Sequence, residues 1–359
     1  MAKRRGGPVL VAMSGGVDSS VAAALMVRRG YDVVGITLQI WQESQTDPRH
    51  SGCCSLGAVE DARRVAAKLK MPHYVINFKE EFRQSVIENF VDEYAAGRTP
   101  NPCVQCNKHV KFDLLLQKMR ELGCETLVTG HYARIRKSAQ GEYRLMLARG
   151  DEKDQSYVLY MLGQKELSVS KFPMGEFASK SDARALAREL GLHLADKPDS
   201  QEICFVSEAG GYREFLRRTR PEAFAEGEVV DSEGRVVGHH EGLSDFTVGQ
   251  RRGIGVATKD PLYVLRLEPA SNRVVIGSDD DLLTREVPLR DLHFPTSVSL
   301  DEGLPVLAKI RYNMAPKAAV LYGGSDPNLV FRKPVRAVTP GQIAVAYRGA
   351  TVIAGGTIK

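Results

Sequence analysis

Residues 9–20 read VLVAMSGGVDSS and form the most informative segment of the chain. The apolar start predicts a buried strand from Val9 to Met13, and Ser14-Gly15-Gly16 predicts a tight turn, because glycine lets the backbone approach a ligand closely. A helix is expected to open at Asp18-Ser19-Ser20, where short oxygen side chains satisfy backbone donors. Because the N-terminus of a helix attracts anions, the segment predicts a phosphate-binding loop.

The spacing of this segment distinguishes it from the commonest phosphate loop. No G-K-[ST] follows the glycines, so it is not a Walker motif. SGG-x-D-S-S directly after an apolar strand resembles the PP-loop of ATP pyrophosphatases, which cleave ATP between the α and β phosphates to adenylate an acceptor. The resemblance implies an ATP-binding enzyme.

Length and charge limit the kinds of protein to consider. The 359 residues exceed one compact domain, so two or three domains are expected. The net charge of +5 permits a nucleic-acid partner without establishing one. No segment approaches the roughly 20 apolar residues of a membrane span, and the apolar part of MAKRRGGPVLVAM is too short for a secretory signal. We therefore expect a cytoplasmic protein with no membrane partner.

The pattern of helical and β-rich segments changes at about residue 205. Before it, helical and β-rich patterns alternate: helices are expected over 18–29, 56–69, 81–94, 108–122 and 179–190, and strands over 9–13, 32–38, 73–78 and 125–129. This alternation favours a parallel sheet with helices on both faces. The phosphate loop follows its first strand, where open α/β sheets bind ligands.

After residue 205, GEVVDSEGRVVG predicts a hairpin, and short β-rich segments recur over 263–267, 273–276, 306–312 and 343–347. We expect an α/β PP-loop catalytic domain over 1–205, then two small β-rich or β-barrel domains over 206–283 and 284–359.

The cysteines carry the second chemical signal. Six of them in a chain this long do not make a disulfide scaffold, and clustered cysteines in a cytosolic protein more often serve catalysis or metal binding. Cys103 and Cys106 form a C-x-x-C motif in a loop just before the helix expected from Lys108, where a thiol has a lowered pKa. Cys204 lies in KPDSQEICF.

Several roles remain open for these thiols on residue chemistry alone: catalysis, a metal cluster, or half of a structural zinc site. A closed zinc site needs two further ligands, for which Cys53, Cys54, Cys204 and His109 compete. Cys124 is expected to be a buried small hydrophobic residue at the start of an apolar strand.

Five motifs together resemble one family: SGGVDSS, RTPNPCVQCNKHVKF, TGHYAR, KDQSYVL and DSQEICF. In kind and order they resemble the bacterial tRNA-specific 2-thiouridylases, which put sulfur on C2 of the wobble uridine in certain tRNAs. The resemblance continues through FTVGQRRG, RYN and PGQ, so it covers nearly the whole chain.

The resemblance implies two chemical steps. ATP, with Mg²⁺, adenylates the C2 oxygen of uridine, and pyrophosphate leaves. Cys204 matches a cysteine that carries a persulfide loaded by a sulfur-relay partner, and Cys106 matches the catalytic nucleophile. Sulfur attacks C2 as the persulfide or as sulfide released by Cys106. In the persulfide scheme a Cys106–Cys204 disulfide closes the cycle, and a reductant must reopen it.

The resemblance also assigns binding residues. Those at ATP are Ala12, Met13, Ser14, Gly15, Gly16, Val17, Asp18 and Ser19, with Leu38 and Gly130 at the adenosine. Those at the target base are Asn101, Pro102 and Cys103. Those facing tRNA are His131, Lys153, Asp154, Gln155, Arg311, Tyr312 and Gln342. A wobble base must be flipped out to reach such a pocket, where Tyr312 suits stacking and Arg311 and Lys153 suit phosphate.

The sequence departs from the family pattern at Cys103, where some relatives carry Asp. A third thiol here completes a possible iron–sulfur ligand set of Cys103, Cys106 and Cys204, with one iron left open to bind sulfide. This cluster is the alternative to the persulfide route.

Two other functions fit the sequence less well. A PP-loop ligase or amidotransferase acting on a small molecule needs neither paired cysteines nor the β-rich half. A non-catalytic RNA-binding protein with a vestigial loop is disfavoured by the intact SGGVDSS and both cysteine motifs.

Overall fold

The computed structural model describes residues 7–41, 56–150, 153–198, 203–206, 209–256, 260–300 and 302–359. Cys53 and Cys54, named above as competing zinc ligands, lie outside these ranges. The chain forms two compact units. Unit 1 comprises Met1–Val86, Cys103–Glu208 and Ala350–Val352, and unit 2 comprises Ile87–Pro102, Ala209–Gly349 and Ile353–Lys359. The division into three domains at residues 206 and 284 stays a prediction.

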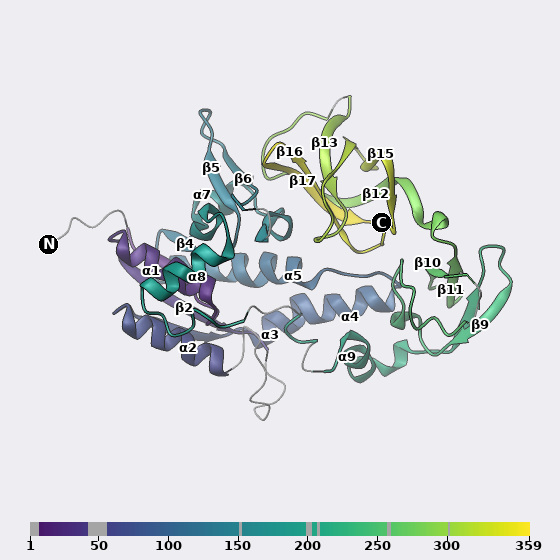
Figure 1. The fold of residues 1–359 in the computed structure, drawn as a ribbon, viewed down its shortest axis with the longest axis horizontal. Helices are drawn as coiled ribbons and strands as arrows, with labels where there is room; N and C mark the ends of the chain where they lie inside the picture. Colours follow the sequence, from purple (N-terminus) through teal and green to yellow (C-terminus); the bar gives the residue numbers. More distant parts are fainter. Residues whose placement is uncertain are drawn as a thin grey trace. The chain divides into compact units, whose positions relative to one another are not determined.

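Unit 1 is built on a parallel sheet of order β3-β2-β1-β4-β7 in the described part of the chain. Its strands are β1 (Val9–Ala12), β2 (Val33–Gln39), β3 (His73–Asn77), β4 (Thr126–Val128) and β7 (Ser170–Lys171). Figure 1 labels two of these strands, β2 and β4. The strand order runs outward from β1 in both directions, through β2 on one side and β4 on the other. Such a reversal opens a crevice beyond the carboxyl ends of the central strands. The predicted parallel sheet is confirmed.

Helices cover both faces of β1. Alternate residues Val9, Val11 and Met13 share a core with α1 (Val17–Arg28), α2 (Leu56–Lys68) and α8 (Lys180–Glu189). Leu10, between them in the strand, is fully buried, and α6 (Leu115–Glu121) packs against β1 and β4. Because successive strand residues point to opposite faces, both faces are covered, as the sequence predicted.

The N-terminus of α8 explains why its start was predictable. Ser179 accepts a hydrogen bond from the Asp182 backbone N–H at 3.2 Å, and Asp182 accepts one from the Ser179 N–H at 3.1 Å. This reciprocal capping box is a local signal that fixes where a helix begins.

Two long helical segments each change from α to π and back. One runs through α3 (Lys79–Phe82), the π-helix η1 (Arg83–Ile87) and α4 (Glu88–Ala95). The other runs through α5 (Pro102–Gln105), the π-helix η2 (Cys106–Leu114) and α6. The prediction of a helix from Lys108 was therefore wrong: it begins at Pro102, a residue suited to the first helical position. Cys103 and Cys106 lie within the helix, not in a loop before it.

The remaining described elements of unit 1 are short. They are the hairpin β5 (Arg134–Lys137) and β6 (Tyr143–Met146), and the helical turns η4 (Ser156–Leu159), α7 (Gln164–Ser168) and η5 (Pro173–Glu176). The sequence analysis did not predict them, because each is too short to show a hydrophobic period.

Unit 2 contains a mixed sheet of order β10-β11-β8-β9. Its strands are β8 (Gly227–Val230), β9 (Val236–His240), β10 (Tyr263–Glu268) and β11 (Arg273–Gly277), preceded by α9 (Tyr212–Thr219). β8 and β9 pair antiparallel, which confirms the hairpin predicted from GEVVDSEGRVVG.

The end of the chain forms a barrel of order β12-β15-β14-β13-β16-β17, closed by pairing of β12 with β17. Its strands are β12 (Leu283–His293), β13 (Leu304–Lys309), β14 (Lys317–Tyr322), β15 (Asn328–Arg336), β16 (Ile343–Arg348) and β17 (Thr351–Ile358). Apolar side chains from all these strands fill its core. Through β17 the same sheet also continues into β6 and β5. Among the helices in the described ranges, none has the length and apolar composition needed to cross a bilayer.

Candidate active site

The loop after β1 takes its shape from Gly15. Its φ is +67°, in the left-handed region, and a Cβ there would lie 2.0 Å from the Ala58 carbonyl oxygen. Only glycine fits such a position without moving α2. Gly16 follows as the N-cap of α1, and no side chain caps the helix there.

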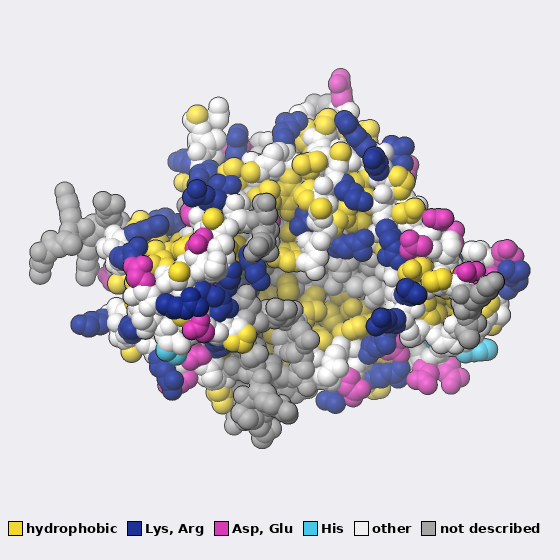
Figure 2. Space-filling view, in the orientation of Figure 1, with side chains coloured by type: hydrophobic (Ala, Val, Ile, Leu, Met, Phe, Trp, Pro, Cys, Tyr) yellow, Lys and Arg dark blue, Asp and Glu magenta, His cyan; other side chains and the backbone are white. Residues whose placement is uncertain are grey.

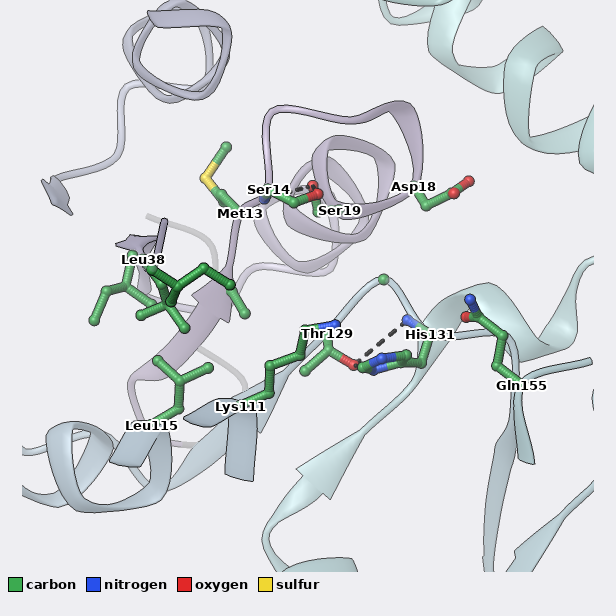
Figure 3. Close-up of a pocket in the computed structure, with 14 residues that line it drawn as sticks. Met13, Ser14, Asp18, Ser19, Leu38, Lys111, Leu115, Thr129, His131 and Gln155 are labelled. Atoms are coloured by element: carbon green, nitrogen blue, oxygen red, sulfur yellow. Dashed lines mark hydrogen bonds between the residues drawn. The ribbon is translucent and has the colours of Figure 1, made fainter. Parts of the chain in front are cut away.

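The hydroxyls at the start of α1 do not cap it, contrary to the sequence prediction. Ser19 and Ser20 instead donate to the Gly16 carbonyl, at 3.2 and 2.9 Å. Ser14 and Ser19 lie together at the loop, with their hydroxyl oxygens 3.2 Å apart (Figure 3). A helix N-terminus without a capping side chain leaves backbone N–H groups for an anion, so the loop suits a phosphate better than predicted.

The loop opens into a pocket of about 210 Å³ (Figure 3). The pocket is lined from β1 and β2 and the residues after them, from the residues after β4, from α1, from the η2–α6 segment and from Gln155. Its lining residues are Ala12, Met13, Ser14, Asp18, Ser19, Ile36, Leu38, Ile40, Lys111, Leu115, Thr129, Gly130, His131 and Gln155. Seven of the residues predicted to bind ATP are among these: Ala12, Met13, Ser14, Asp18, Ser19, Leu38 and Gly130. Gly15 and Gly16 belong to the loop and Val17 begins α1, and these three are not among the lining residues. A Cβ on Gly130 would lie 2.7 Å from the Ser19 backbone nitrogen, so the loop after β4 packs closely against the first turn of α1.

Some lining residues were not predicted from the sequence, because they lie outside the motifs. Ile36 and Ile40 come from β2 and the residue after it, and they give one end of the pocket an apolar wall together with Leu38 and Leu115. An apolar wall beside a phosphate-binding loop suits a flat purine ring. The strand order, which places the end of β2 beside β1, is the signal that identifies them.

Asp18 is held by two partners. Lys180 at the start of α8 donates to both carboxylate oxygens at 2.5 Å, and the Tyr132 hydroxyl donates to Oδ1 at 2.7 Å. The Lys180 side chain is only 12% exposed, so this ion pair is largely shielded from water. The pair joins α8 to the first turn of α1.

A second lysine contacts the loop itself. Lys197 donates to the Gly15 carbonyl at 3.0 Å and to Asp61 at 2.7 Å, and His193 lies 2.9 Å from the same carboxylate. Burial raises the pKa of Asp61, but the hydrogen bonds from Lys197 and His193 outweigh it, so the pKa lies below its ordinary value. Lys197 begins the segment that leads to Cys204.

The thiols differ in exposure. Cys103 is exposed, Cys106 is buried at 8% exposure and Cys204 is intermediate. Next to Cys204, Phe205 packs edge-on against Trp41 and Phe82, with ring centroids 6.2 and 5.8 Å apart. Phe82 lies in α3, and α3 packs against η2, which begins at Cys106. The segments carrying Cys106 and Cys204 are therefore both anchored at α3.

The structure also tests the ligand set proposed for an iron–sulfur cluster or zinc. Among the residues that the structure describes, no three His, Cys, Asp or Glu side chains are grouped so that they could hold a metal ion. Cys103, Cys106 and Cys204 thus do not form a ligand set in this structure, and we derive no step through a cluster.

Two of the residues predicted to face tRNA, His131 and Gln155, line the pocket, and a third, Asp154, precedes Gln155 in the chain. His131 lies 2.8 Å from the Thr129 hydroxyl and is 9% exposed. Gln155 Oε1 accepts from the Tyr132 N–H at 3.0 Å, and Asp154 accepts from the Ser156 hydroxyl at 2.7 Å. The contacts of His131 and Gln155 order the loop that follows β4, and the contact of Asp154 orders residues 154–156.

His131 makes a prediction about pH. Burial, with the charge of Lys111, holds the pKa of His131 well below its ordinary 6.5. As the pH falls, His131 therefore binds a proton in the unfolded chain before it does so in the folded chain. As the pH falls below about 6.5, the free energy of unfolding should drop by up to about 1.4 kcal/mol per pH unit through this residue. Urea unfolding at pH 5 to 8 should show a shallower pH dependence for His131→Asn; an identical dependence would contradict the assignment.

The other three predicted tRNA-facing residues with described contacts lie in unit 2. Arg311 and Tyr312 are exposed after β13, and the Lys309 ammonium lies 5.6 Å from the Tyr312 ring centre. Gln342 has a different role: its amide donates to the Thr99 carbonyl at 3.0 Å and to the Pro100 carbonyl at 3.4 Å. It thereby holds the backbone just before Asn101.

The same segment is fixed by a second group. Arg98 donates to both oxygens of Glu93 at 2.7 Å, and Arg290 of β12 donates to them at 3.3 and 3.2 Å. Burial raises the pKa of Glu93, but the two arginines more than offset this and hold the pKa below its ordinary value. The barrel thus positions the segment that leads into the C-x-x-C helix.

A phosphate loop after β1, a facing loop after β4 and an apolar end to the pocket define a PP-loop nucleotide-binding domain. Family models agree: residues 7–208 match a tRNA methyl transferase HUP domain, residues 213–278 a tRNA methyl transferase PRC-barrel domain, and residues 284–358 an aminomethyltransferase beta-barrel domain.

Relatives that match along the whole chain identify the family. Proteins from Heliobacterium modesticaldum and Clostridioides difficile are 50% and 44% identical to this chain, each over 98% of it and over 92% and 98% of their own lengths. One from Carboxydothermus hydrogenoformans is 47% identical over 98% of this chain and 97% of its own. Each is named a tRNA-specific 2-thiouridylase. The chain belongs to the tRNA-specific 2-thiouridylase family, which confirms the resemblance inferred from its motifs.

The contacts of Gln342 predict how the barrel supports the reaction. Gln342→Ala should free the backbone at Thr99 and Pro100 and lower kcat/KM for tRNA thiolation about tenfold, because small misplacements of binding groups slow reactions strongly. Amide hydrogen exchange over residues 98–103, measured without tRNA, should be faster in the variant. Unchanged exchange with a lower rate would mean that Gln342 acts by touching tRNA alone.

Proposed function

We propose that this protein uses ATP to adenylate the C2 oxygen of the wobble uridine in tRNA and then replaces that oxygen with sulfur. The observation that carries the proposal is the uncapped N-terminus of α1, which meets the pocket at the strand-order reversal of unit 1. Two thiol-bearing segments, at Cys106 and Cys204, are anchored at the neighbouring helix α3.

The pocket orients ATP along its length. Adenine would lie at the apolar end formed by Ile36, Leu38 and Ile40, and the phosphates would lie at Ser14 and the first turn of α1. Mg²⁺ binds proteins through one or two carboxylates together with substrate phosphates, and it neutralises phosphate charge. Among the described lining residues the carboxylate is Asp18, and Mg²⁺ would share it with Lys180, which donates to both of its oxygens.

The tRNA would be recognised by both units. Asn101, Pro102 and Cys103 would contact the flipped uracil. Arg311 and Lys153 would bind phosphates, and the exposed ring of Tyr312 would stack on a base. Figure 2 shows Lys and Arg side chains spread over the visible face, interspersed with Asp and Glu. His131, Asp154, Gln155 and Gln342 would act at the RNA through the backbone that they order.

Sulfur transfer would follow adenylation. A donor protein loads a persulfide on Cys204, and its terminal sulfur attacks C2, so AMP leaves with the former C2 oxygen. The Cys106 thiolate then attacks the Cys204 sulfur and breaks the S–S bond, which leaves sulfur on C2 and a Cys106–Cys204 disulfide. A dithiol reductant restores both thiols. The enzyme would work in the cytoplasm, where thiols are kept reduced.

The cluster alternative has a separate test. Protein purified anaerobically should contain no iron, show no visible absorbance and still thiolate tRNA from a persulfide donor. Iron bound in proportion to activity, and lost together with it on Cys103→Asp substitution, would replace the persulfide scheme.

Adenylation is tested by labelling the oxygen that leaves. Unmodified tRNA carrying ¹⁸O at uracil C2 should yield AMP that contains ¹⁸O, and pyrophosphate should form only when tRNA is present. Inorganic phosphate as product, or pyrophosphate release independent of tRNA, would contradict the proposal and favour a small-molecule ligase.

A further inference from the structure

One cation lines the nucleotide pocket without a role in the chemistry described so far. Among the described lining residues Lys111 is the one Lys or Arg. Lys111 lies in η2, and its side chain extends into the pocket that Thr129 and Ser14 also line (Figure 3). The same charge helps to lower the pKa of His131, after the larger effect of burial. A positive group therefore lies inside the pocket proposed for ATP.

The π-helix explains how Lys111 reaches this position. Lys111 follows Cys106 by five residues, and both belong to η2. In an α-helix, residues five apart lie about 140° from each other around the axis. In a π-helix the N–H of residue i+5 bonds to the carbonyl of residue i, so such residues lie nearly one above the other. η2 thus places the catalytic thiol and the pocket lysine on the same helical face.

The neighbouring lining residue fixes which phosphate Lys111 would meet. Leu115 lies four residues further along the same helical segment and belongs to the apolar end of the pocket. Lys111 is therefore next to the adenosine end, whereas Ser14 and the first turn of α1 form the polar end. The α-phosphate is the first phosphate met on passing from adenosine toward the polar end.

We propose that Lys111 is a catalytic residue that binds the nonbridging oxygens of the ATP α-phosphate. This rests on the proposed function, because it requires ATP in this pocket. As the C2 oxygen bonds to the α-phosphorus, the bond from that phosphorus to the bridging oxygen breaks, pyrophosphate leaves with the electron pair, and the N3 proton goes to solvent. Lys111 stays protonated and stabilises the negative charge at the α-phosphate.

The position beside Cys106 extends this role to the second step. When sulfur attacks C2, the leaving group is AMP, whose charge is again on the α-phosphate. A lysine on the thiol-bearing helical face keeps that charge neutralised while the C2–oxygen bond breaks. One residue thereby assists both departures, first of pyrophosphate and then of AMP.

The test compares the full-length protein with Lys111→Met, Lys111→Arg and Lys108→Met. Lys108 lies on the same π-helix but is exposed and is not a lining residue, so it is the matched control. Lys111→Met should lower kcat for tRNA-dependent pyrophosphate release about 10³-fold with little change in KM for ATP. Lys111→Arg should recover part of the rate, and Lys108→Met should stay within about threefold of wild type.

A thio analogue identifies the phosphate involved. Sulfur in place of one nonbridging α-phosphate oxygen of ATP should slow the wild type, and Lys111→Met should lose most of that effect, because contacting groups are energetically coupled. An undiminished thio effect in the variant, or pyrophosphate release by Lys111→Met near the wild-type rate, would overturn the inference. Wild-type protein that releases no tRNA-dependent pyrophosphate would instead overturn the proposed function itself.

Two readouts guard against a merely structural explanation. Thermal unfolding should be nearly unchanged in Lys111→Met, because methionine has a similar shape. Imidazole NMR should show a higher pKa for His131 in Lys111→Met than in wild type, because a nearby positive charge has been removed. If Lys111→Met does not fold, the thio effect is measured on Lys111→Arg, where an undiminished effect counts against the inference.

Discussion

Replacing Cys204 with Ser is expected to lower thiolation of tRNA at least about 10³-fold while tRNA-dependent pyrophosphate release stays within about threefold of wild type. The reason is that a serine oxygen cannot carry a transferable sulfur, whereas adenylation uses the pocket at α1. Cys106→Ser should have the same effect on thiolation. The measurement is parallel quantification of thiouridine and pyrophosphate with a persulfide donor.

The matched control for both is Cys124→Ala. Cys124 is 5% exposed, and burial together with the negative charge of Asp32 raises the pKa of its thiol, so it is protonated and unreactive. Its replacement should leave both products at wild-type levels. Thiolation by Cys204→Ser at the normal rate would show that Cys204 is not the sulfur carrier.

Gly15→Ala is expected to reduce pyrophosphate release at least about 100-fold. The new Cβ would lie 2.0 Å from the Ala58 carbonyl oxygen, so the loop or α2 must move. The backbone N–H groups at the start of α1 would then no longer point at the phosphates. The rate at saturating ATP and tRNA, measured below the unfolding temperature of the variant, tests this expectation.

Gly123→Ala separates this collision from backbone strain. Gly123 has a φ of +66°, close to the +67° of Gly15, but has no neighbour within 4 Å of the added Cβ. Both variants therefore carry the same left-handed strain, about 1 kcal/mol of stability. Only Gly15→Ala displaces the loop. Equal losses of activity in the two variants would contradict the role given to the loop.

The sequence predicted the α/β sheet and the phosphate loop because both depend on local patterns. The apolar run before Gly15 and the capping residues at Ser179 act within a few residues of themselves. The start of the C-x-x-C helix was mispredicted although Pro102 is a local signal for a first helical position. The π-helical part that follows it, η2, packs against α3, and this tertiary contact has no local sequence pattern.

The lysines around the site could not be predicted from local sequence patterns, because their positions also depend on tertiary structure. Lys180 and Lys197 meet the loop after more than 160 intervening residues. Lys111 lies within a quoted motif, but its position in the pocket depends on the extra residue per turn of η2. Motifs therefore identified the groups that define the family, and the fold identified the lysines that surround them.

The measurement that tests the central claim most directly is nucleoside mass spectrometry of unmodified tRNA. The tRNA is incubated anaerobically with this protein, ATP, Mg²⁺ and a sulfur donor, and parallel reactions omit ATP or use Cys204→Ser. A sulfur-for-oxygen mass gain on the wobble uridine that requires both ATP and Cys204 is the predicted result. No mass gain in the complete mixture, with no pyrophosphate formed on adding tRNA, would contradict the account.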